Sequence, residues 1–144
     1  MKRKILMFLA ILGIASTASL ANEDRPLASV NARASSVLDA YIEAHINNDA
    51  DLFNQILNDG ATLKVNRQDQ IVKHSKRELI KFYKKGGKLL LNCEAEQEIL
   101  SECGCIMIAR VDFRYPAFVQ QNYIQIEKDK DGSWKITQIN RINT

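Results

Sequence analysis

Two of the three cysteines in this chain lie either side of Gly104, within the segment Ser101–Met107. Paired thiols can form a disulfide, a redox centre or part of a metal site, or they can simply flank a turn. A bridge between Cys103 and Cys105 would be strained, and a C-x-C pair without His or Cys partners is weak evidence for zinc. We therefore expect Gly104 to be the turn residue, Cys103 an exposed tip and Cys105 the first inward side chain of the next strand.

The third cysteine, Cys93, is expected on a strand that leads toward this turn. It would lie about ten residues along the strand, and at about 3.3 Å per residue that is too far from Cys103 or Cys105 for a bridge. The sequence also lacks a nucleophile elbow, a Gly-rich phosphate loop and paired histidines at metal-ligand spacing. We therefore expect three free thiols, no metal and no cofactor.

The other candidates for chemistry are Tyr41 and His45, which lie four residues apart and hence one turn apart on a helix. If both side chains converge to about 3 Å in an open pocket, they can act as acid and base. Buried carboxylates, which have pKa values suited to proton transfer, are not expected on the inward face of the first two long strands, because Asp112 points outward there. His74 is expected to face water. We therefore expect a non-catalytic domain, with a small lyase or isomerase that uses Tyr41 and His45 as the alternative.

The elements that would position these residues begin with helices. Apolar residues recur at three- and four-residue steps over Val30–Ile46, which predicts an amphipathic helix. Asp49 suits the N-cap of a second short helix that ends at Asp59-Gly60. The capping-box pattern Ser75–Glu78 precedes an apolar run and predicts a third helix, which Gly86-Gly87 ends.

Strand signals fill the rest of the chain. The expected strands are 61–65, 71–73, 88–101, 105–115, 118–128 and 133–142. Helices that come early and strands that come late are typical of the α+β class. A curved, mostly antiparallel sheet with helices on one face would leave a pocket between the two layers.

The first two long strands can be aligned on their turn. With residues 102–104 as the turn, residues oppose each other when their numbers sum to about 206. Ala95 then pairs with Val111, and Glu96 pairs with Arg110. The face that carries Ala95 and Val111 is mostly apolar, so it should face the helices, while the other face carries most of the charges.

Three stretches of the chain carry a resemblance to a known group of domains. They are the helix that ends at Asn48-Asp49-Ala50, the Ala61–Leu63 and Ile71-Val72 strands with the capped Ser75–Glu78 helix, and Tyr123–Ile126 followed by Asp131–Ile136. In these stretches the chain resembles the nuclear transport factor 2-like superfamily, and within it the small family named for lumazine binding. The resemblance implies a cone-shaped α+β domain over residues 30–144, with three N-terminal helices packed on a curved, mostly antiparallel sheet.

The resemblance also carries expectations about function. Some enzymes of this superfamily, such as ketosteroid isomerase and polyketide cyclase, place carboxylates or a His/Asp pair in the cone. Other features of the superfamily imply a homodimer through the open sheet face, where Ile106, Ile108 and Ile139 would supply apolar surface. We expect a non-catalytic domain that binds a small apolar or aromatic ligand in the cone or serves as a dimeric interaction module. The fold does not by itself determine which ligand that is.

The candidate pocket residues come from both layers, although large apolar side chains are most often buried for packing alone. They are Tyr41, His45, Phe53, Ile56, Phe82, Tyr83, Met107, Ala109, Val111, Phe113, Tyr123, Gln125 and Trp134.

The N-terminal segment 1–21 has a basic start, an apolar run and a small-residue end, which is the layout of a secretory signal peptide. Residues 22–29 would form a flexible leader. Because segment 1–21 holds three basic residues and no acidic ones, the formal net charge of +3 belongs to it, and the remaining chain gives no overall support for a nucleic-acid or anionic-membrane partner. We expect an exported protein, periplasmic or secreted, without a stable membrane anchor.

Overall fold

A computed structural model of the protein describes residues 27–144. The expected signal peptide, residues 1–21, lies outside the described residues, as does most of the expected leader, 22–29. Among the described residues, no helix is both long enough and apolar enough to cross a membrane.

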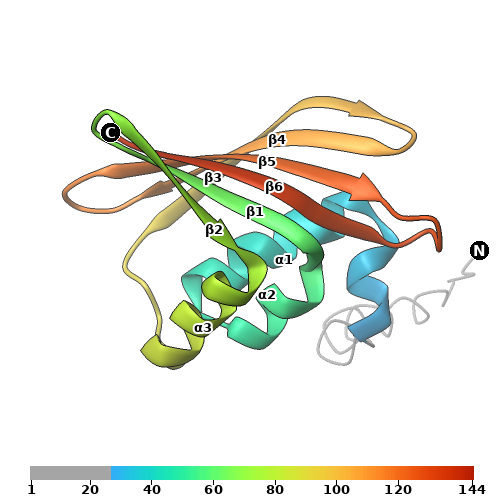
Figure 1. Cartoon of the computed structure of the whole chain (residues 1–144), viewed down its shortest axis with the longest axis horizontal. Helices are drawn as coiled ribbons and strands as arrows, with labels where there is room; N and C mark the ends of the chain where they lie inside the picture. Colours follow the sequence, from blue (N-terminus) through green and yellow to red (C-terminus); the bar gives the residue numbers. More distant parts are fainter. Residues whose placement is uncertain (1–26) are drawn as a thin grey trace, which may run out of the picture.

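In the described part of the chain, three α-helices pack against one face of a six-stranded sheet (Figure 1). The helical elements are a 3-10 helix η2 (Leu27–Ala32), α1 (Ala34–Ile46), α2 (Ala50–Ile56) and α3 (Lys76–Gly86). The strands are β1 (Leu57–Arg67), β2 (Gln70–Ser75), β3 (Glu94–Cys103), β4 (Ile106–Arg114), β5 (Val119–Lys128) and β6 (Trp134–Asn143).

The strand order in the sheet is β2-β1-β6-β5-β4-β3. Every neighbouring pair is antiparallel except β1 and β6, which are parallel. The expected α+β class and the mostly antiparallel sheet are therefore confirmed. Because β1 pairs with β6, the early β1–β2 hairpin lies beside the last strand of the chain.

Local capping signals fix the helix ends where the sequence predicts them. Asp49 accepts hydrogen bonds from the backbone N–H groups of Asp51 and Leu52, both at 3.1 Å, at the start of α2. Ser75 Oγ accepts from the Glu78 N–H at 3.2 Å, while Glu78 Oε2 accepts from the Ser75 N–H at 2.7 Å. This capping box is confirmed.

Three element boundaries differ from the sequence expectation. The Val30–Ile46 pattern is divided by an extended residue, Arg33, into η2 and α1. The strand β1 already begins at Leu57, so Asp59-Gly60 lies inside a strand and not at a helix end. A register shift against β6 absorbs these residues. The strand β3 begins only at Glu94.

The β3–β4 register is shifted from the expected one. Ala95 pairs with Phe113 and not with Val111, a shift of two residues that keeps the side chains of Glu94–Ile99 on their expected faces. Beyond Ile99 a further register shift places Ser101 opposite Ile108. The turn lies at Gly104 and Cys105. Cys103 is therefore the last residue of β3 and Cys105 is an exposed turn residue, so the inward placement expected for Cys105 is wrong.

The charged pairs on the outer face follow the shifted register. Glu96 lies opposite Asp112 and forms an ion pair with Arg114 at 2.8 Å, where the sequence expectation paired it with Arg110. Arg110 instead contacts Asp112 at 2.9 Å. Cys93, Cys103 and Cys105 are free thiols in the structure.

The core lies between the helices and the inner face of the sheet. Its largest fully buried side chains include Tyr41, Leu38, Phe53, Phe113, Ile124, Ile126, Ile136 and Ile139. Because Ile139 faces this core, it does not supply apolar surface on the open face of the sheet, contrary to expectation. Ile108, which is 36% exposed, remains available there.

Candidate functional site

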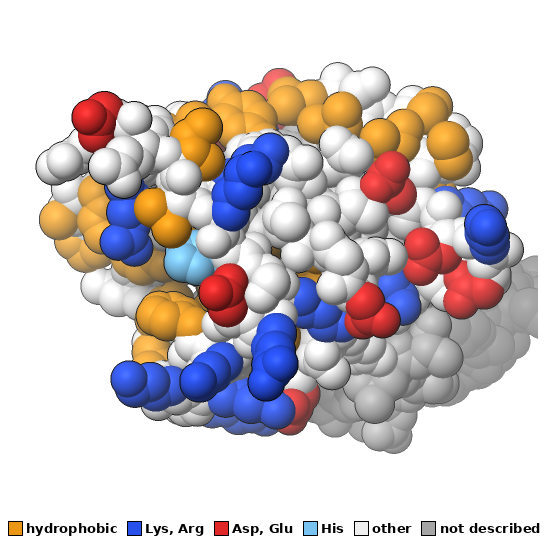
Figure 2. Space-filling model, viewed as in Figure 1, with side chains coloured by type: hydrophobic (Ala, Val, Ile, Leu, Met, Phe, Trp, Pro, Cys, Tyr) orange, Lys and Arg blue, Asp and Glu red, His pale blue; other side chains and the backbone are white. Residues whose placement is uncertain are grey.

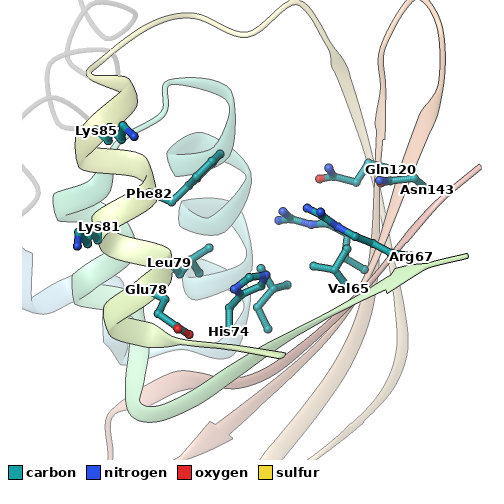
Figure 3. Close-up of a pocket in the computed structure, with 12 residues that line it drawn as sticks. Val65, Arg67, His74, Glu78, Leu79, Lys81, Phe82, Lys85, Gln120 and Asn143 are labelled. Carbon is teal, nitrogen blue, oxygen red and sulfur yellow. The ribbon is translucent and has the colours of Figure 1, made fainter. Parts of the chain in front are cut away.

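A cavity of about 500 Å³ lies between α3 and the inner face of one end of the sheet (Figure 3). Its lining comes from β1, β2 and α3 and from residues near the ends of β5 and β6. In Figure 3, Leu79 and Phe82 on α3 point across the cavity toward Val65 and Arg67 on β1. Two layers of the fold therefore face each other across a space of ligand size.

Strand alternation decides which residues of the sheet reach this space. Leu63, Val65 and Arg67 are two residues apart along β1, so their side chains share one face. His74 lies opposite Leu63 on β2, and Arg141 lies opposite Val65 on β6. His74 is half-buried at the cavity, where the sequence expectation had it facing water.

The guanidinium of Arg141 is held from its core side by neutral groups. Its Nε donates to Asn122 Oδ1 at 2.8 Å, and its Nη2 donates to the Tyr41 hydroxyl at 3.2 Å. The Tyr41 hydroxyl in turn donates to Asn122 Oδ1 at 3.1 Å. None of the described residues forms an ion pair with Arg141, so its positive charge is not neutralised within this part of the chain.

The remaining charges at the cavity are mostly positive. Arg67, Lys81 and Lys85 line it together with Arg141. Glu78 also lines it, but its carboxylate accepts the Ser75 N–H at 2.7 Å. That hydrogen bond holds the pKa of Glu78 below its ordinary value. The lining as a whole therefore favours a negatively charged occupant.

The cavity also contains a polar group without a partner. Gln120 Oε1 is buried and has no hydrogen-bond partner among the described residues, although Gln120 lines the cavity. A buried polar atom of this kind normally finds a partner in the protein, in water or in a ligand. Gln120 and the neighbouring Asn143 thus provide hydrogen-bonding capacity opposite α3 (Figure 3).

The Tyr41 and His45 side chains belong to a buried polar network and are not among the residues that line the cavity. His45 Nε2 lies 2.6 Å from the Tyr115 hydroxyl, and its Nδ1 lies 3.4 Å from the Tyr83 hydroxyl. The ring stacks on Phe113 with centroids 3.8 Å apart. His45 is thus enclosed on several sides by aromatic residues.

Burial makes both groups unsuited to proton transfer near neutral pH. Burial, together with the nearby charge of Arg141, lowers the pKa of His45 to about 3. Burial raises the pKa of Tyr41 to about 12, despite the opposing effect of Arg141. His45 is therefore neutral and Tyr41 keeps its proton near neutral pH. Both residues act as uncharged hydrogen-bonding groups in the core.

The other expected pocket residues are distributed differently. Of the expected set, Phe82 lines the cavity. Buried core positions are taken by Phe53, Ile56, Tyr83, Met107, Ala109, Val111 and Phe113. Trp134 is half-buried and packs against the core, and its carbonyl accepts a hydrogen bond from Asn31 at 2.9 Å.

The inward placement of Tyr123 and Gln125 is wrong. Tyr123 lies opposite Arg110 and Gln125 lies opposite Ile108, all on the outer face of the sheet. Ile124, the residue between them along β5, is fully buried in the core. The physical reason is the two-residue period of a strand, because an error of one residue moves a whole set of side chains to the opposite face.

Eleven of the twelve residues that line the cavity are absent from the expected pocket set, among them Arg67, Gln120, Arg141 and Asn143. A signal for Arg141 is nevertheless present in the sequence, since it lies two residues after Ile139, which is fully buried. Residues two apart in a strand share a face. A correct register for the last hairpin would therefore have placed this arginine on the helix side.

No protein-family model matches the chain, and no curated protein sequence matches it. Solved structures do match. A protein of unknown function from Silicibacter pomeroyi, described as NTF-2 like, has a TM-score of 0.67 at 13% identity, over 83% of this chain and 100% of that one. The chain has the nuclear transport factor 2-like fold.

Two further solved structures are similar to the chain in fold. A protein of unknown function from Shewanella baltica has a TM-score of 0.64 at 17% identity, over 85% of this chain and 98% of that one. A ketosteroid isomerase-like protein from Erwinia carotovora atroseptica has a TM-score of 0.58 at 15% identity, over 79% and 95%. At these identities the similarity concerns the nuclear transport factor 2-like fold alone.

Proposed function

We propose that this domain binds a small organic anion with an apolar body in the cavity between α3 and β1. The observation that carries the proposal is the Arg141 guanidinium, which reaches a cavity of about 500 Å³ and has neutral partners on its core side. Cavities of about 300 to 1,000 Å³ are typical of small-molecule sites. The expected apolar or aromatic ligand is thereby refined to one that also carries negative charge.

The two walls of the cavity offer different chemistry to such a ligand. A partly buried cation without an anionic partner is costly, and a carboxylate or sulfonate would form charge-assisted hydrogen bonds with it. Arg67 supplies a second guanidinium on the same wall. Leu79 and Phe82 on the opposite wall offer an apolar surface for the body of the ligand.

The setting that we propose for this activity is outside the cytoplasm. The basic start, apolar run and small-residue end of residues 1–21 support export. The domain would then bind its ligand in the periplasm or after secretion. Cell fractionation followed by mass spectrometry of the N-terminus tests this, and recovery of the uncleaved chain from the cytoplasm would contradict it.

The alternative function, a lyase or isomerase that uses Tyr41 and His45, has less support. The likeness to a ketosteroid isomerase-like protein is a likeness of fold. Burial moves the pKa values of Tyr41 and His45 away from neutrality, in opposite directions, to about 12 and about 3. General acid–base catalysis works best with pKa values near the working pH, so the network fits a structural role better.

A pair of fluorescent probes tests the proposed ligand class. Anilinonaphthalene sulfonate is an aromatic anion, and N-phenylnaphthylamine is its neutral counterpart. We expect the protein to bind the sulfonate more tightly than the amine in fluorescence titrations. Arg67→Gln should weaken sulfonate binding by about tenfold, the equivalent of one lost charge-assisted contact, and leave the amine unchanged.

The control variant for this experiment is Asn143→Trp, which places a large side chain at an exposed position on the cavity lining. It should weaken the binding of both probes, because the larger side chain occupies cavity space that either probe would need and leaves the charge of the lining unchanged. Equal affinity for the two probes, together with no effect of Arg67→Gln, would show that the cavity does not select anions.

A further inference from the structure

The helix α3 and the residues after it concentrate positive charge that the charge balance of the whole chain hides. Within residues 76–88, Glu78 is the only acidic residue, among six basic ones. One of these, Lys76, is engaged by Asp59 at 3.1 Å. The other five form what we call the basic face. Its members are Arg77, Lys81, Lys84, Lys85 and Lys88.

The basic face points away from the core. Arg77, Lys81, Lys84 and Lys85 share one side of α3 by helical spacing, and Lys88 lies just after the helix ends at Gly86. All five residues are exposed, whereas Leu79 and Tyr83 on the opposite side of α3 are buried. None of the five forms an ion pair with a described residue.

Large apolar side chains accompany this charge. Phe82 is 70% exposed on α3, and in the segment that follows Leu90 is 77% exposed and Leu89 is 46% exposed. Figure 2 shows Lys and Arg side chains gathered over α3 at the lower left, with hydrophobic side chains beside them. A face that served only to keep the helix in water would not need exposed apolar residues of this size.

We propose that the basic face and these apolar residues dock the protein reversibly on an anionic lipid surface. Lysines attract the phosphate groups of the lipid, while Leu89 and Leu90 insert at the boundary between headgroups and acyl chains. This docking is a peripheral contact and requires no membrane-spanning segment.

The chemistry favours lipid over a protein or nucleic-acid partner. Lysine is depleted in protein–protein interfaces and arginine is enriched, yet every member of the basic face except Arg77 is a lysine. Arginine is also the better residue for bidentate recognition of phosphate. Lysines with protruding apolar neighbours instead match the composition of interfacial helices.

Docking would also orient the cavity. Phe82 lines the cavity, and Lys81 and Lys85 line it as well as belonging to the basic face. The cavity would therefore lie close to the lipid surface. This consequence rests on the proposed function, whereas the docking itself does not, because lipid binding is measured without any cavity ligand.

Vesicle sedimentation tests the proposal with the full chain. We expect binding to vesicles of phosphatidylcholine mixed with phosphatidylglycerol, weaker binding as salt is added, and little binding to phosphatidylcholine alone. The triple variant Lys81→Gln, Lys84→Gln, Lys85→Gln should lower the partition coefficient at least tenfold.

A charge-matched control accounts for the rest of the chain, including its basic N-terminus. Lys73→Gln, Lys128→Gln, Lys130→Gln removes the same charge from exposed positions outside α3 and should leave vesicle binding nearly unchanged. If the two triple variants lose binding equally, the basic face is not the docking surface.

The apolar residues give the experiment a second readout. Leu89→Ser with Leu90→Ser should weaken vesicle binding while leaving its dependence on salt unchanged, because it removes insertion and not charge. No effect of this double variant, with equally strong binding to polyglutamate, would point to an acidic protein partner and overturn the lipid proposal.

Discussion

At the scale of single residues, the buried polar groups next to the cavity have different roles. Asn122 accepts hydrogen bonds from Arg141 at 2.8 Å and from Tyr41 at 3.1 Å, and it is fully buried. It therefore anchors the guanidinium without neutralising it. His45 lies deeper among aromatic rings, where a charged form would lose its hydration.

The low pKa of His45 predicts a pH dependence of stability. Its pKa is about 3 in the fold and 6.5 ordinarily, so below pH 6.5 the unfolded chain takes up a proton that the folded chain refuses. The free energy of unfolding should therefore fall as pH is lowered through this window, by up to about 1.4 kcal/mol per pH unit. His45→Gln should remove this contribution in urea denaturation series between about pH 4.5 and pH 6.5.

The matched control for this prediction is Asn54→Gln, a change at an exposed and uncharged position of α2. It should keep the wild-type slope of unfolding free energy against pH. Identical slopes for wild type and His45→Gln would mean that His45 titrates normally in the folded protein.

At the scale of elements, local sequence signals succeeded where the structure is locally determined. The caps at Asp49 and Ser75 need partners only two or three residues away, and Gly87 ends α3 with a positive φ of 69°. Asp59-Gly60 was expected to end the second helix but lies inside β1, because β1 pairs with β6, which is far along the chain. That long-range ladder outweighs a local turn signal.

The capping box predicts a local contribution to stability. Ser75→Ala leaves the N–H groups at the start of α3 without the Ser75 oxygen, and the unfolding free energy should fall by about 1 kcal/mol. Ser101→Ala is a suitable control, because Ser101 is exposed in β3 and its loss should stay within about 0.5 kcal/mol. Equal urea midpoints for the two variants would show that the cap contributes nothing.

At the scale of the whole molecule, the cavity is a product of tertiary structure. Leu79 on α3, Val65 on β1 and Arg141 on β6 meet across it although they are far apart in sequence. The sequence could predict the fold class and the inward faces of β4, because alternation is local. It could not place the cavity, since that required the parallel β1–β6 pairing and the inward face of the last hairpin.

Because the cavity joins these elements, its occupant should stabilise the molecule as a whole. A ligand that binds only the folded state, at a hundred times its Kd, raises the unfolding free energy by about 2.7 kcal/mol. For a domain of this size that corresponds to a rise in Tm of roughly 10 °C. We expect this shift from anilinonaphthalene sulfonate at saturation, measured by calorimetry. Arg67→Gln at the same probe concentration should show a clearly smaller rise, and a fall in Tm with the probe would mean that it binds the unfolded chain instead of the cavity.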